Sequence, residues 1–390
     1  MRIRSGGAWV FHLTKTLRAL LRRRDAVPDE ELGDRLYAQA NVAFQAGRHA
    51  DAASLAARAR ELVPGSWQLA LLHGLALLEL GRWQESANAS ERALELGVDY
   101  PYRAMAEASR ALALARSDIA GGVSAPQLQL GPAPPSFSVI VCSISPEKFA
   151  RVSENYRRLL SGVDHEIIGI HDARSLCEGY NRGVRQSRGE ILVFSHDDIE
   201  IVSPDFAARL VRTLAAADLV GVAGTTELSG GRWSNSGWPH THGQVCHRNP
   251  DGTLKHTLAG PGFGSVRGIQ AMDGLLFAGW RKAFVDLGFD EETFDGWHFY
   301  DLDFTFRAWL AGLRLCVDYE ILVVHDSEGS YDSEWNRYEQ RFRQKHEGRF
   351  TPRPPPDGAR YPITRLRSAQ EWLLVSHHLF SRREREAAAR

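Results

Sequence analysis

The sequence predicts an α/β domain preceded by an all-α helical domain. Three observations predict this arrangement: the first third of the chain repeats with a period of 34 residues, a stretch rich in Gly and Pro then breaks every periodicity, and short apolar strands alternate with amphipathic helices beyond it. Such alternation is typical of a mostly parallel, Rossmann-like sheet flanked by helices. We therefore expect a basic amphipathic segment at 1–30, helical repeats at 31–118, a linker at 119–136, the α/β domain at 137–350, and a C-terminal extension with a helix at 351–390.

Composition excludes several classes of function. The 390 residues carry 47 basic and 48 acidic side chains, a net charge of −1, so no global field attracts nucleic acid and no nucleic-acid partner is expected. No stretch reaches the eighteen apolar residues that a membrane span needs. The four cysteines, Cys142, Cys177, Cys246 and Cys316, form no CxxC pair, which indicates buried thiols in a reducing, cytoplasmic compartment.

The first 24 residues are basic and contain no acid, with Trp, Phe and Leu between the charges. Such a segment suits peripheral contact with the anionic inner face of a membrane. The alternative is an N-terminal helix packed on the next domain, or a frayed start. A secretory signal is not expected, because Lys15 and Arg18 interrupt the apolar part.

The repeats are read directly from the residues. Gly47-Arg48 recurs as Gly81-Arg82, and Glu61-Leu62 recurs as Glu95-Leu96, each 34 positions later. This period with paired helical patterns resembles tetratricopeptide repeats, followed by a third, unfinished unit or cap at 102–115. The resemblance implies a concave face for a peptide or protein partner; a spacer or an oligomerisation surface is the alternative.

The α/β part begins with a nucleotide-binding pattern. Consecutive parallel strands joined by right-handed crossovers deliver their carboxyl ends to one crevice. Strand one leads into Cys142-Ser143-Ile144-Ser145-Pro146, so no glycine-rich turn is present to hold phosphates, and a metal is expected instead. We expect strands at 137–141, 166–170, 191–194 and 321–324, and helices at 149–160, 177–186 and 369–380.

The central strand 191–194 ends in Ser195-His196-Asp197-Asp198. Asp198 is the expected metal ligand, because hard oxygen ligands suit Mg²⁺ or Mn²⁺; a cap of the following turn is the alternative. Asp197 is expected to hydrogen-bond the bound ligand instead of the metal. His196 is either a ligand or a partner of a ligand, since imidazole suits Mn²⁺ better than Mg²⁺.

An ordered set of motifs extends this pattern. Its members are His171-Asp172, Gly179-Tyr180-Asn181-Arg182-Gly183, the acidic cluster, Asp273-Gly274-Leu275-Leu276-Phe277-Ala278, Leu287-Gly288-Phe289-Asp290-Glu291 and Tyr300-Asp301-Leu302-Asp303. Over about Phe137 to His325 the set resembles family 2 glycosyltransferases of the GT-A fold. Two positions depart from the usual motifs: His196 stands where Asp is usual, and Tyr300 where Glu is usual, so the chain is similar to a branch with a His-x-Asp motif.

The resemblance implies a glycosyltransferase that depends on Mn²⁺ or Mg²⁺. The donor would be a nucleotide-diphosphate sugar, with UDP-sugars favoured, and the acceptor a hydroxyl of a glycan, lipid-linked sugar or protein. Family analogy implies inversion at the anomeric carbon. Two rivals stay open: a tetratricopeptide adaptor with an inactive transferase domain, and a nucleotidyltransferase, which would want a basic, glycine-rich loop after strand one.

Asp301 is the candidate general base. We expect it at the start of a helix, whose positive end would keep the carboxylate ionised; an N-cap is the alternative. The resemblance implies His325 as a third metal ligand, although a strand-end His satisfied by neighbours fits as well. The expected nucleotide-sugar contacts are Ser143, Asp172, Asn181, Asp197 and Asp273, of which Asp172 could instead be a turn former.

The stretch 230–256 is rich in Trp, Gly and His. Its spacings match no standard zinc pattern, so we expect a solvent-facing loop that binds the acceptor sugar. Trp238, Trp280 and Trp297 are the weak candidates for stacking on a sugar ring, and buried packing is the alternative for each.

Overall fold

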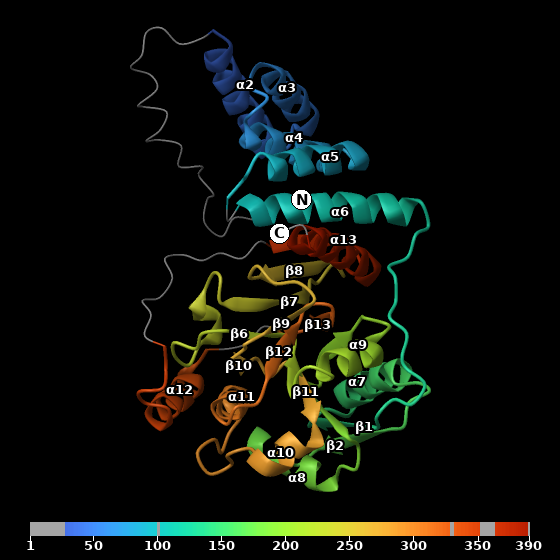
Figure 1. Ribbon diagram of the computed structural model, residues 1–390, viewed down its shortest axis with the longest axis vertical. Helices are drawn as coiled ribbons and strands as arrows, with labels where there is room; N and C mark the ends of the chain where they lie inside the picture. Colours follow the sequence, from blue (N-terminus) through green and yellow to red (C-terminus); the bar gives the residue numbers. More distant parts are fainter. Residues whose placement is uncertain (1–27, 100–101, 328–330, 352–362, 389–390) are drawn as a thin grey trace. The chain divides into compact units, whose positions relative to one another are not determined.

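The computed structural model describes residues 28–99, 102–327, 331–351 and 363–388 (Figure 1). The chain forms two compact units: a helical unit of Met1–Ala125 with Pro362–Arg365 and Gln370–Arg390, and an α/β unit of Pro126–Tyr361 with Leu366–Ala369. The basic segment expected at a membrane surface lies outside the described residues, so that expectation stays a prediction. None of the described helices has the length and apolar character needed to cross a membrane.

The helical unit contains the repeats. Its helices are α2 (Pro28–Gln45), α3 (His49–Leu62), α4 (Trp67–Glu79), α5 (Trp83–Glu95) and α6 (Tyr102–Ala120). Helices α3 and α5 begin 34 residues apart (83 − 49), and the turn before each holds a glycine in the left-handed region, Gly47 at φ 74° and Gly81 at φ 73°. Only glycine adopts this conformation without cost, so the repeated Gly-Arg pair sets the turn between paired helices. The expected helical repeats are present; their assignment as tetratricopeptide repeats stays a prediction.

The last helix, α13 (Ala369–Ala388), belongs to the helical unit and is longer than expected. It is joined to α6 by ion pairs between buried or half-buried side chains. Arg383 Nε donates to Glu107 at 3.1 Å, Arg116 Nε to Glu371 at 2.8 Å, and His378 Nε2 lies 2.6 Å from Asp118. The C-terminal helix therefore closes the repeat array, a role that no local sequence pattern indicated.

These ion pairs give the first prediction. Glu107→Ala removes the buried carboxylate that pairs with Arg103 and with the Arg383 guanidinium, which is 9% exposed. Breaking a buried pair from one side costs about 3–5 kcal/mol, because the remaining charge stays desolvated. The free energy of unfolding of the helical unit, followed by circular dichroism in urea, should fall by that amount.

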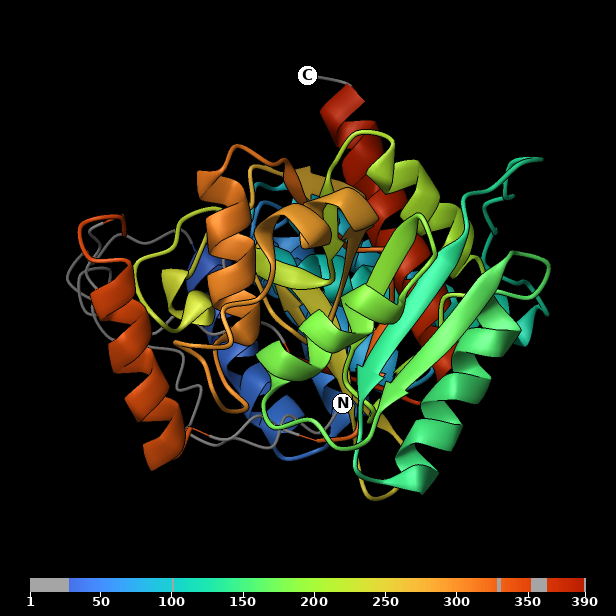
Figure 2. The ribbon, with the colours of Figure 1, turned by 90° about the horizontal axis from the view of Figure 1, so that it is seen from below.

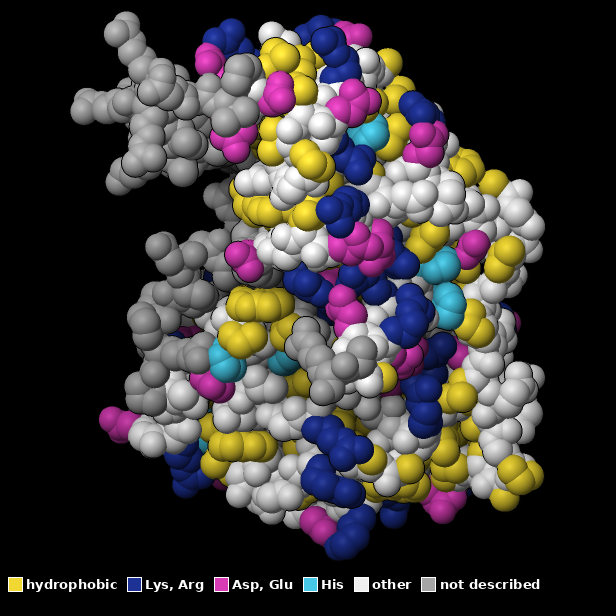
Figure 3. All heavy atoms as spheres, turned by 45° about the horizontal axis from the view of Figure 1, so that its top comes forward, with side chains coloured by type: hydrophobic (Ala, Val, Ile, Leu, Met, Phe, Trp, Pro, Cys, Tyr) yellow, Lys and Arg dark blue, Asp and Glu magenta, His cyan; other side chains and the backbone are white. Residues whose placement is uncertain are grey.

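The matched control removes a carboxylate from an exposed pair. Arg92 and Glu95 lie 3.1 Å apart with side chains 45% and 54% exposed, and Figure 3 shows acidic and basic side chains next to one another on the face drawn. Exposed pairs contribute about 0–1 kcal/mol, so Glu95→Ala should change stability little. Equal effects of Glu107→Ala and Glu95→Ala would show that α13 is not held by its buried pairs.

The α/β unit is built on a seven-stranded sheet. Its order is β2 (His165–Ile170), β1 (Phe137–Cys142), β3 (Ile191–Ser195), β11 (Leu276–Trp280), β5 (Leu219–Gly221), β12 (Leu315–Asp318) and β9 (Ser265–Arg267). Strand β1 runs parallel to β2 and β3, whereas β11 is antiparallel to β3 and to β5. The predicted α/β class is confirmed, and the three strands predicted first are present with ends shifted by one residue.

Helices cover both faces of this sheet because its strands are apolar on both faces. Alternate residues such as Val139 and Val193 form one core with α7 (Pro146–Leu159) and α9 (Phe206–Leu214). The intervening Phe194 stacks on Phe277 on the opposite face, beside α8 (Leu176–Gln186), α10 (Arg281–Leu287) and α11 (Tyr300–Leu310). Figure 2 shows β1 and β2 between α7 and α8. Burial on both faces is typical of parallel strands.

A second sheet has the order β10 (Ala271–Met272), β6 (Ala223–Thr225), β7 (Thr241–Arg248), β13 (Val323–His325) and β4 (Ile199–Ile201), with β8 (Leu254–Ala259) also paired to β7. The strand expected at 321–324 thus begins two residues later. The remaining elements are the 3-10 turn η1 (Trp233–Ser236), helix α12 (Ser333–Lys345) and strand β14 (Ile363–Leu366).

This sheet corrects one expectation. The stretch 230–256 is not a single solvent-facing loop, because β7 and β8 form an antiparallel hairpin in which His242, Cys246 and His256 are buried. Burial lowers the pKa of His242 and of His256 to about 4. Both imidazoles are therefore neutral components of the interior, and the exposed part of the stretch is confined to the segment before β7 and the hairpin turn.

Candidate active site

Strand pairing brings together three residues that the sequence separates. His196 and Asp198 follow β3, and the chain continues directly into β4. Strand β4 pairs antiparallel with β13, so that His325 at the end of β13 lies opposite Ile199. The carboxyl end of the central strand thus receives an imidazole from 129 positions away.

The ligand atoms of His196, Asp198 and His325 all lie within 4.8 Å of one another. His325 Nε2 is 3.2 Å from Asp198 Oδ1, and His196 Nδ1 is 3.5 Å from His325 Nε2 and 4.0 Å from Asp198 Oδ1. Two imidazole nitrogens and one carboxylate oxygen form a donor set that fits Mn²⁺ better than Mg²⁺, which prefers oxygen ligands.

The electrostatics of this cluster favour the forms that bind a cation. Burial would raise the pKa of Asp198, but its interactions with His325 hold the pKa well below the usual range. Burial, together with His325, lowers the pKa of His196. An ionised carboxylate and a neutral imidazole are the states in which these side chains ligate metals.

Lys148 supplies a positive charge beside the carboxylates. Its Nζ lies 3.5 Å from Asp198 Oδ2 and 3.8 Å from Asp197 Oδ1. Lys148 is in the first turn of α7, where its backbone N–H donates to the N-cap hydroxyl of Ser145 at 3.2 Å. The loop after β1 thus offers a flexible ammonium and a helix N-terminus, both of which attract phosphate oxygens.

Two of the expected nucleotide contacts meet here. Ser143 Oγ donates to Asp197 Oδ2 at 2.6 Å, joining the loops that follow β1 and β3. Asp197 therefore points toward the β1 loop, whereas Asp198 points toward His325. The two adjacent carboxylates have different neighbours, as their different expected roles require.

Asp301 and Asp273 form a second pair of carboxylates. Asp301 Oδ2 accepts from the N–H of Gly274 at 2.6 Å, while Asp273 accepts from Leu275 N at 2.9 Å and from Trp233 Nε1 at 3.0 Å. Burial, together with the charge of Asp273, raises the pKa of Asp301 from 3.8 to about 7. A carboxyl with a pKa near neutrality suits general base catalysis.

The environment of Asp301 corrects two details. We expected the helix N-terminus to keep the carboxylate ionised, but burial and the charge of Asp273 raise its pKa, although hydrogen bonds from the backbone of Leu302 and Gly274 act to lower it. The N-cap of α11 is Phe299, in the left-handed region at φ 65°, and no side chain caps the helix there. The alternative role of Asp301 as N-cap is therefore wrong.

Two other carboxylates near α11 are bound by other side chains. Asp303 is fully buried and faces two cations and an imidazole, with Arg307 Nε, Lys345 Nζ and His346 Nε2 at 2.7, 2.6 and 2.9 Å. Asp295 accepts from Tyr338 and from Arg341 on α12. Neither is placed with the Asp273–Asp301 pair.

Two expected nucleotide contacts have other partners. Both ends of the Asn181 amide bond the backbone of Phe289, at 2.8 Å each, so the structure gives Asn181 a packing role and does not bring it to the cluster. Asp172 follows the edge strand β2, is 81% exposed and pairs with Arg182 at 2.8 Å. Because the carboxylate of Asp172 is accessible, its contact with a nucleotide stays a prediction.

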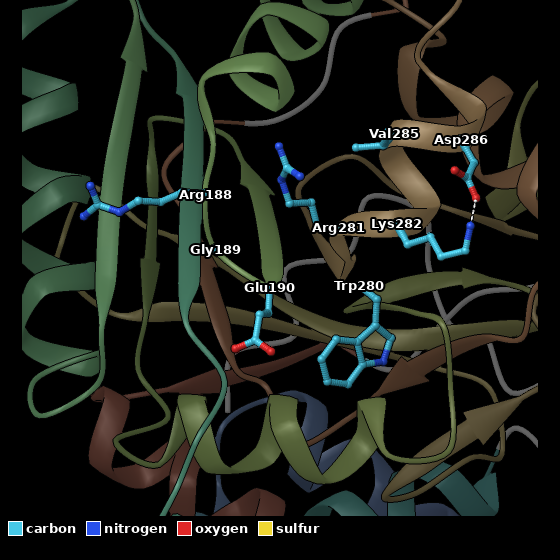
Figure 4. A pocket seen from close by; sticks show the side chains of 8 residues that line it. All are labelled: Arg188, Gly189, Glu190, Trp280, Arg281, Lys282, Val285 and Asp286. Atoms are coloured by element: carbon cyan, nitrogen blue, oxygen red, sulfur yellow. Dashed lines mark hydrogen bonds and ion pairs between the residues drawn. The ribbon is translucent and has the colours of Figure 1, made fainter.

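Trp280 lies away from the cluster. In the pairing of β11 with β3, Leu276 is opposite Ser195 and Trp280 is opposite Ile191, at the far end of the strand. There Trp280 lines a pocket of about 480 Å³ with Arg188, Glu190 and Arg281 (Figure 4), and its Nε1 donates to Leu214 O at 3.2 Å. Trp280 therefore lies at the end of β11 away from the cluster, and its contact with an acceptor sugar stays a prediction.

Trp238 and Trp297 are exposed, by 37% and 45%. Trp297 lies in the segment that leads into α11 and Asp301, and Trp238 follows η1, whose Trp233 bonds Asp273. Both positions are accessible to an acceptor.

Sequence reasoning missed several residues of the site. Tyr300 Oη lies 2.9 Å from His196 Nε2, and Ser327 Oγ lies 3.1 Å from His325 Nε2. The ring centroids of His247 and His325 are 5.5 Å apart. Lys148 could have been identified from the sequence as a basic residue in the first helical turn after strand one. Tyr300 was noted only as a departure from the usual motif, and for its contact with His196, as for Ser327 and His247, the sequence carries no signal.

An α/β domain with a His-Asp-His cluster and a near-neutral Asp at its strand ends is typical of metal-dependent group-transfer enzymes. Residues 138–346 match the family described as "Glycosyltransferase like family". The match covers more than half of the chain, and the protein belongs to this family. The predicted enzyme class is thereby confirmed. No curated protein matched the sequence.

Two solved structures are remotely similar to this chain. GalNAc-T7 with UDP, GalNAc and Mn²⁺ aligns at 13% identity and a TM-score of 0.35, over 55% of this chain and 52% of the other, so the match spans about half of that protein. The mannosyltransferase PcManGT from Pyrobaculum calidifontis, in complex with GDP-Man and Mn²⁺, aligns at 12% identity and a TM-score of 0.36, over 80% of this chain and 88% of the other.

Proposed function

We propose that the protein transfers a sugar from a nucleotide-diphosphate sugar, with UDP-sugars favoured, to a hydroxyl acceptor, with Mn²⁺ held by His196, Asp198 and His325. The observation that carries the proposal is the joint presence of a three-ligand cluster and a carboxyl of near-neutral pKa, Asp301. A dead transferase domain would be expected to lose one of these.

The donor site rests on three side chains besides the ligands. Lys148 and the N-terminus of α7 would pair with diphosphate oxygens, which carry more charge as the bond to the sugar breaks. The Ser143–Asp197 pair and the exposed Asp172 are assigned to the ribose or base. The bound metal would supply neutralisation of the departing diphosphate.

Asp301 is assigned as the general base. It would accept the proton of the acceptor hydroxyl as that oxygen attacks the anomeric carbon, while the diphosphate leaves on the opposite side. A single in-line displacement inverts the anomeric configuration. Asp273 supports this role by raising the pKa of Asp301, and its bond to Trp233 ties the base to the segment that contains Trp238.

The acceptor and the helical unit complete the proposal. Exposed Trp297 and Trp238 would stack on an acceptor sugar, which belongs to a glycan, lipid-linked sugar or protein. The repeats would bind a peptide or protein partner, and residues 1–24 would add contact with a membrane surface.

A donor panel tests this function. Purified full-length protein is incubated with UDP-, GDP-, ADP- and dTDP-sugars, with Mn²⁺, Mg²⁺ or EDTA, and release of the nucleoside diphosphate is measured. Slow hydrolysis of one donor with Mn²⁺, lost in EDTA, is expected. Binding of nucleotide without turnover of any donor would favour the inactive adaptor, and release of pyrophosphate from a nucleoside triphosphate would favour a nucleotidyltransferase.

A further inference from the structure

Tyr300 contacts His196 on the side of the ring that faces away from the other two candidate ligands. The tyrosine opens α11, and its Oη lies 2.9 Å from His196 Nε2, across 104 positions of sequence. The other ring nitrogen, Nδ1, faces Asp198 and His325. One imidazole therefore has its two nitrogens divided between the cluster and the phenol.

This division determines where the imidazole proton must be. Nδ1 can bind a cation only through a free lone pair, so in the neutral ring the proton is on Nε2. Nε2–H then donates to Tyr300 Oη, and the phenol O–H donates to the carbonyl of Gly274 at 3.3 Å. Each donor in this chain has an acceptor, so the arrangement favours the tautomer that leaves Nδ1 free.

The series of hydrogen bonds continues to Asp301, the proposed general base. Gly274 accepts from Tyr300 with its carbonyl and donates its N–H to Asp301 Oδ2 at 2.6 Å. The packing requires glycine, because a Cβ at position 274 would lie 2.1 Å from Tyr300 Oη and 2.9 Å from Asp301 Cβ. A hydrogen-bonded path therefore runs from His196 through Tyr300 and Gly274 to Asp301.

We infer that Tyr300 is a positioning residue that fixes His196 in the tautomer presenting Nδ1 to the cation, and that Gly274 connects this support to the base. The inference rests on the proposed metal site. It assigns no contact between Tyr300 and substrate. Loss of such an outer partner typically lowers metal affinity about 10- to 100-fold.

The test uses the full chain and Mn²⁺ alone, without nucleotide. Isothermal titration should give a Kd for Mn²⁺ weaker by about 10- to 100-fold in Tyr300→Phe than in wild type. A second readout needs no metal: ¹⁵N NMR of the His196 ring should show the proton on Nε2 in wild type and a mixture of tautomers in Tyr300→Phe. A purely structural role would not move that signal.

Tyr319→Phe is the matched control. Tyr319 is a buried tyrosine whose Oη lies 3.1 Å from His242 Nδ1 and donates to Ala259 O, in another part of the α/β unit. This variant should bind Mn²⁺ as wild type does. Gly274→Ala displaces the Tyr300 ring without removing the phenol and should weaken Mn²⁺ binding as Tyr300→Phe does.

The possible outcomes distinguish a failure of the role of Tyr300 from a failure of the metal site. Unchanged Mn²⁺ affinity and tautomer in Tyr300→Phe would overturn the inference and leave the metal site standing. A wild-type protein that binds no Mn²⁺ would remove both. If Tyr300→Phe does not fold, the wild-type tautomer decides, because a proton on Nδ1 of His196 contradicts the inference.

Discussion

Asp301→Asn should reduce sugar transfer about a hundredfold or more while donor and Mn²⁺ binding stay close to wild type. The amide oxygen of Asn can still accept from Gly274 N, so the local hydrogen bond is kept, but no group is left to accept the acceptor's proton. The wild-type rate should fall as pH drops below about 7, where Asp301 becomes protonated, and this dependence should disappear in the variant. Single-turnover transfer across pH 5.5–8.5 measures both effects.

Stability gives the same variant a second signature. Because the folded-state pKa is raised, the unfolded chain loses this proton first, and wild-type stability declines as pH rises from about 4 toward 7. Asn carries no such penalty. Asp301→Asn should therefore melt at or above the wild-type temperature at pH 8 without added metal, and match it near pH 4.

Asp295→Asn is the matched control for the base. Asp295 precedes the same helix, but its carboxylate accepts from Tyr338 and Arg341 on α12. Transfer by this variant should be near normal. Normal transfer by Asp301→Asn would move the base to Asp273, the remaining carboxylate of the pair.

Asp198→Ala should abolish the thermal stabilisation that Mn²⁺ and UDP give together, while the protein stays folded. Asp198 is the one carboxylate of the cluster, and its loss leaves two imidazoles with little affinity for Mn²⁺. We expect a loss larger than the 10- to 100-fold typical of an outer partner.

Asp218→Ala provides the comparison for this second variant. Asp218 is also a paired carboxylate, 2.9 Å from Arg314, but it precedes β5 at the opposite end from the cluster. Its Mn²⁺- and UDP-dependent shift should equal that of wild type. A full shift in Asp198→Ala would place the metal elsewhere.

The elements of the α/β unit were predictable because their signals are local. The apolar run 191–194 defines β3, and the amphipathic pattern at 149–160 predicted α7, which begins three residues earlier at Pro146 and ends at Leu159. The 34-residue offset of Gly47 and Gly81 likewise predicted the helical repeats. The strand and helix signals depend on near neighbours in the sequence, and the repeat is visible because the same residues recur at a fixed spacing.

The contacts that complete the site are not local. His196 and Tyr300 were both noted as departures from a familiar motif, but only strand pairing and the placement of α11 show that they touch. The raised pKa of Asp301 depends on its burial and on Asp273, and the docking of α13 depends on Glu107, and both partners are distant in sequence. The position of Trp280 away from the cluster was not predictable, because the direction of β11 decides which end of the sheet it reaches.

Anomalous diffraction from a crystal containing Mn²⁺ and UDP, recorded at the manganese edge, tests the central claim most directly. We expect one strong peak bounded by His196 Nδ1, Asp198 Oδ1 and His325 Nε2, with the diphosphate on its open side. A peak bound by other residues, or UDP bound with no peak at these three side chains, would contradict the account.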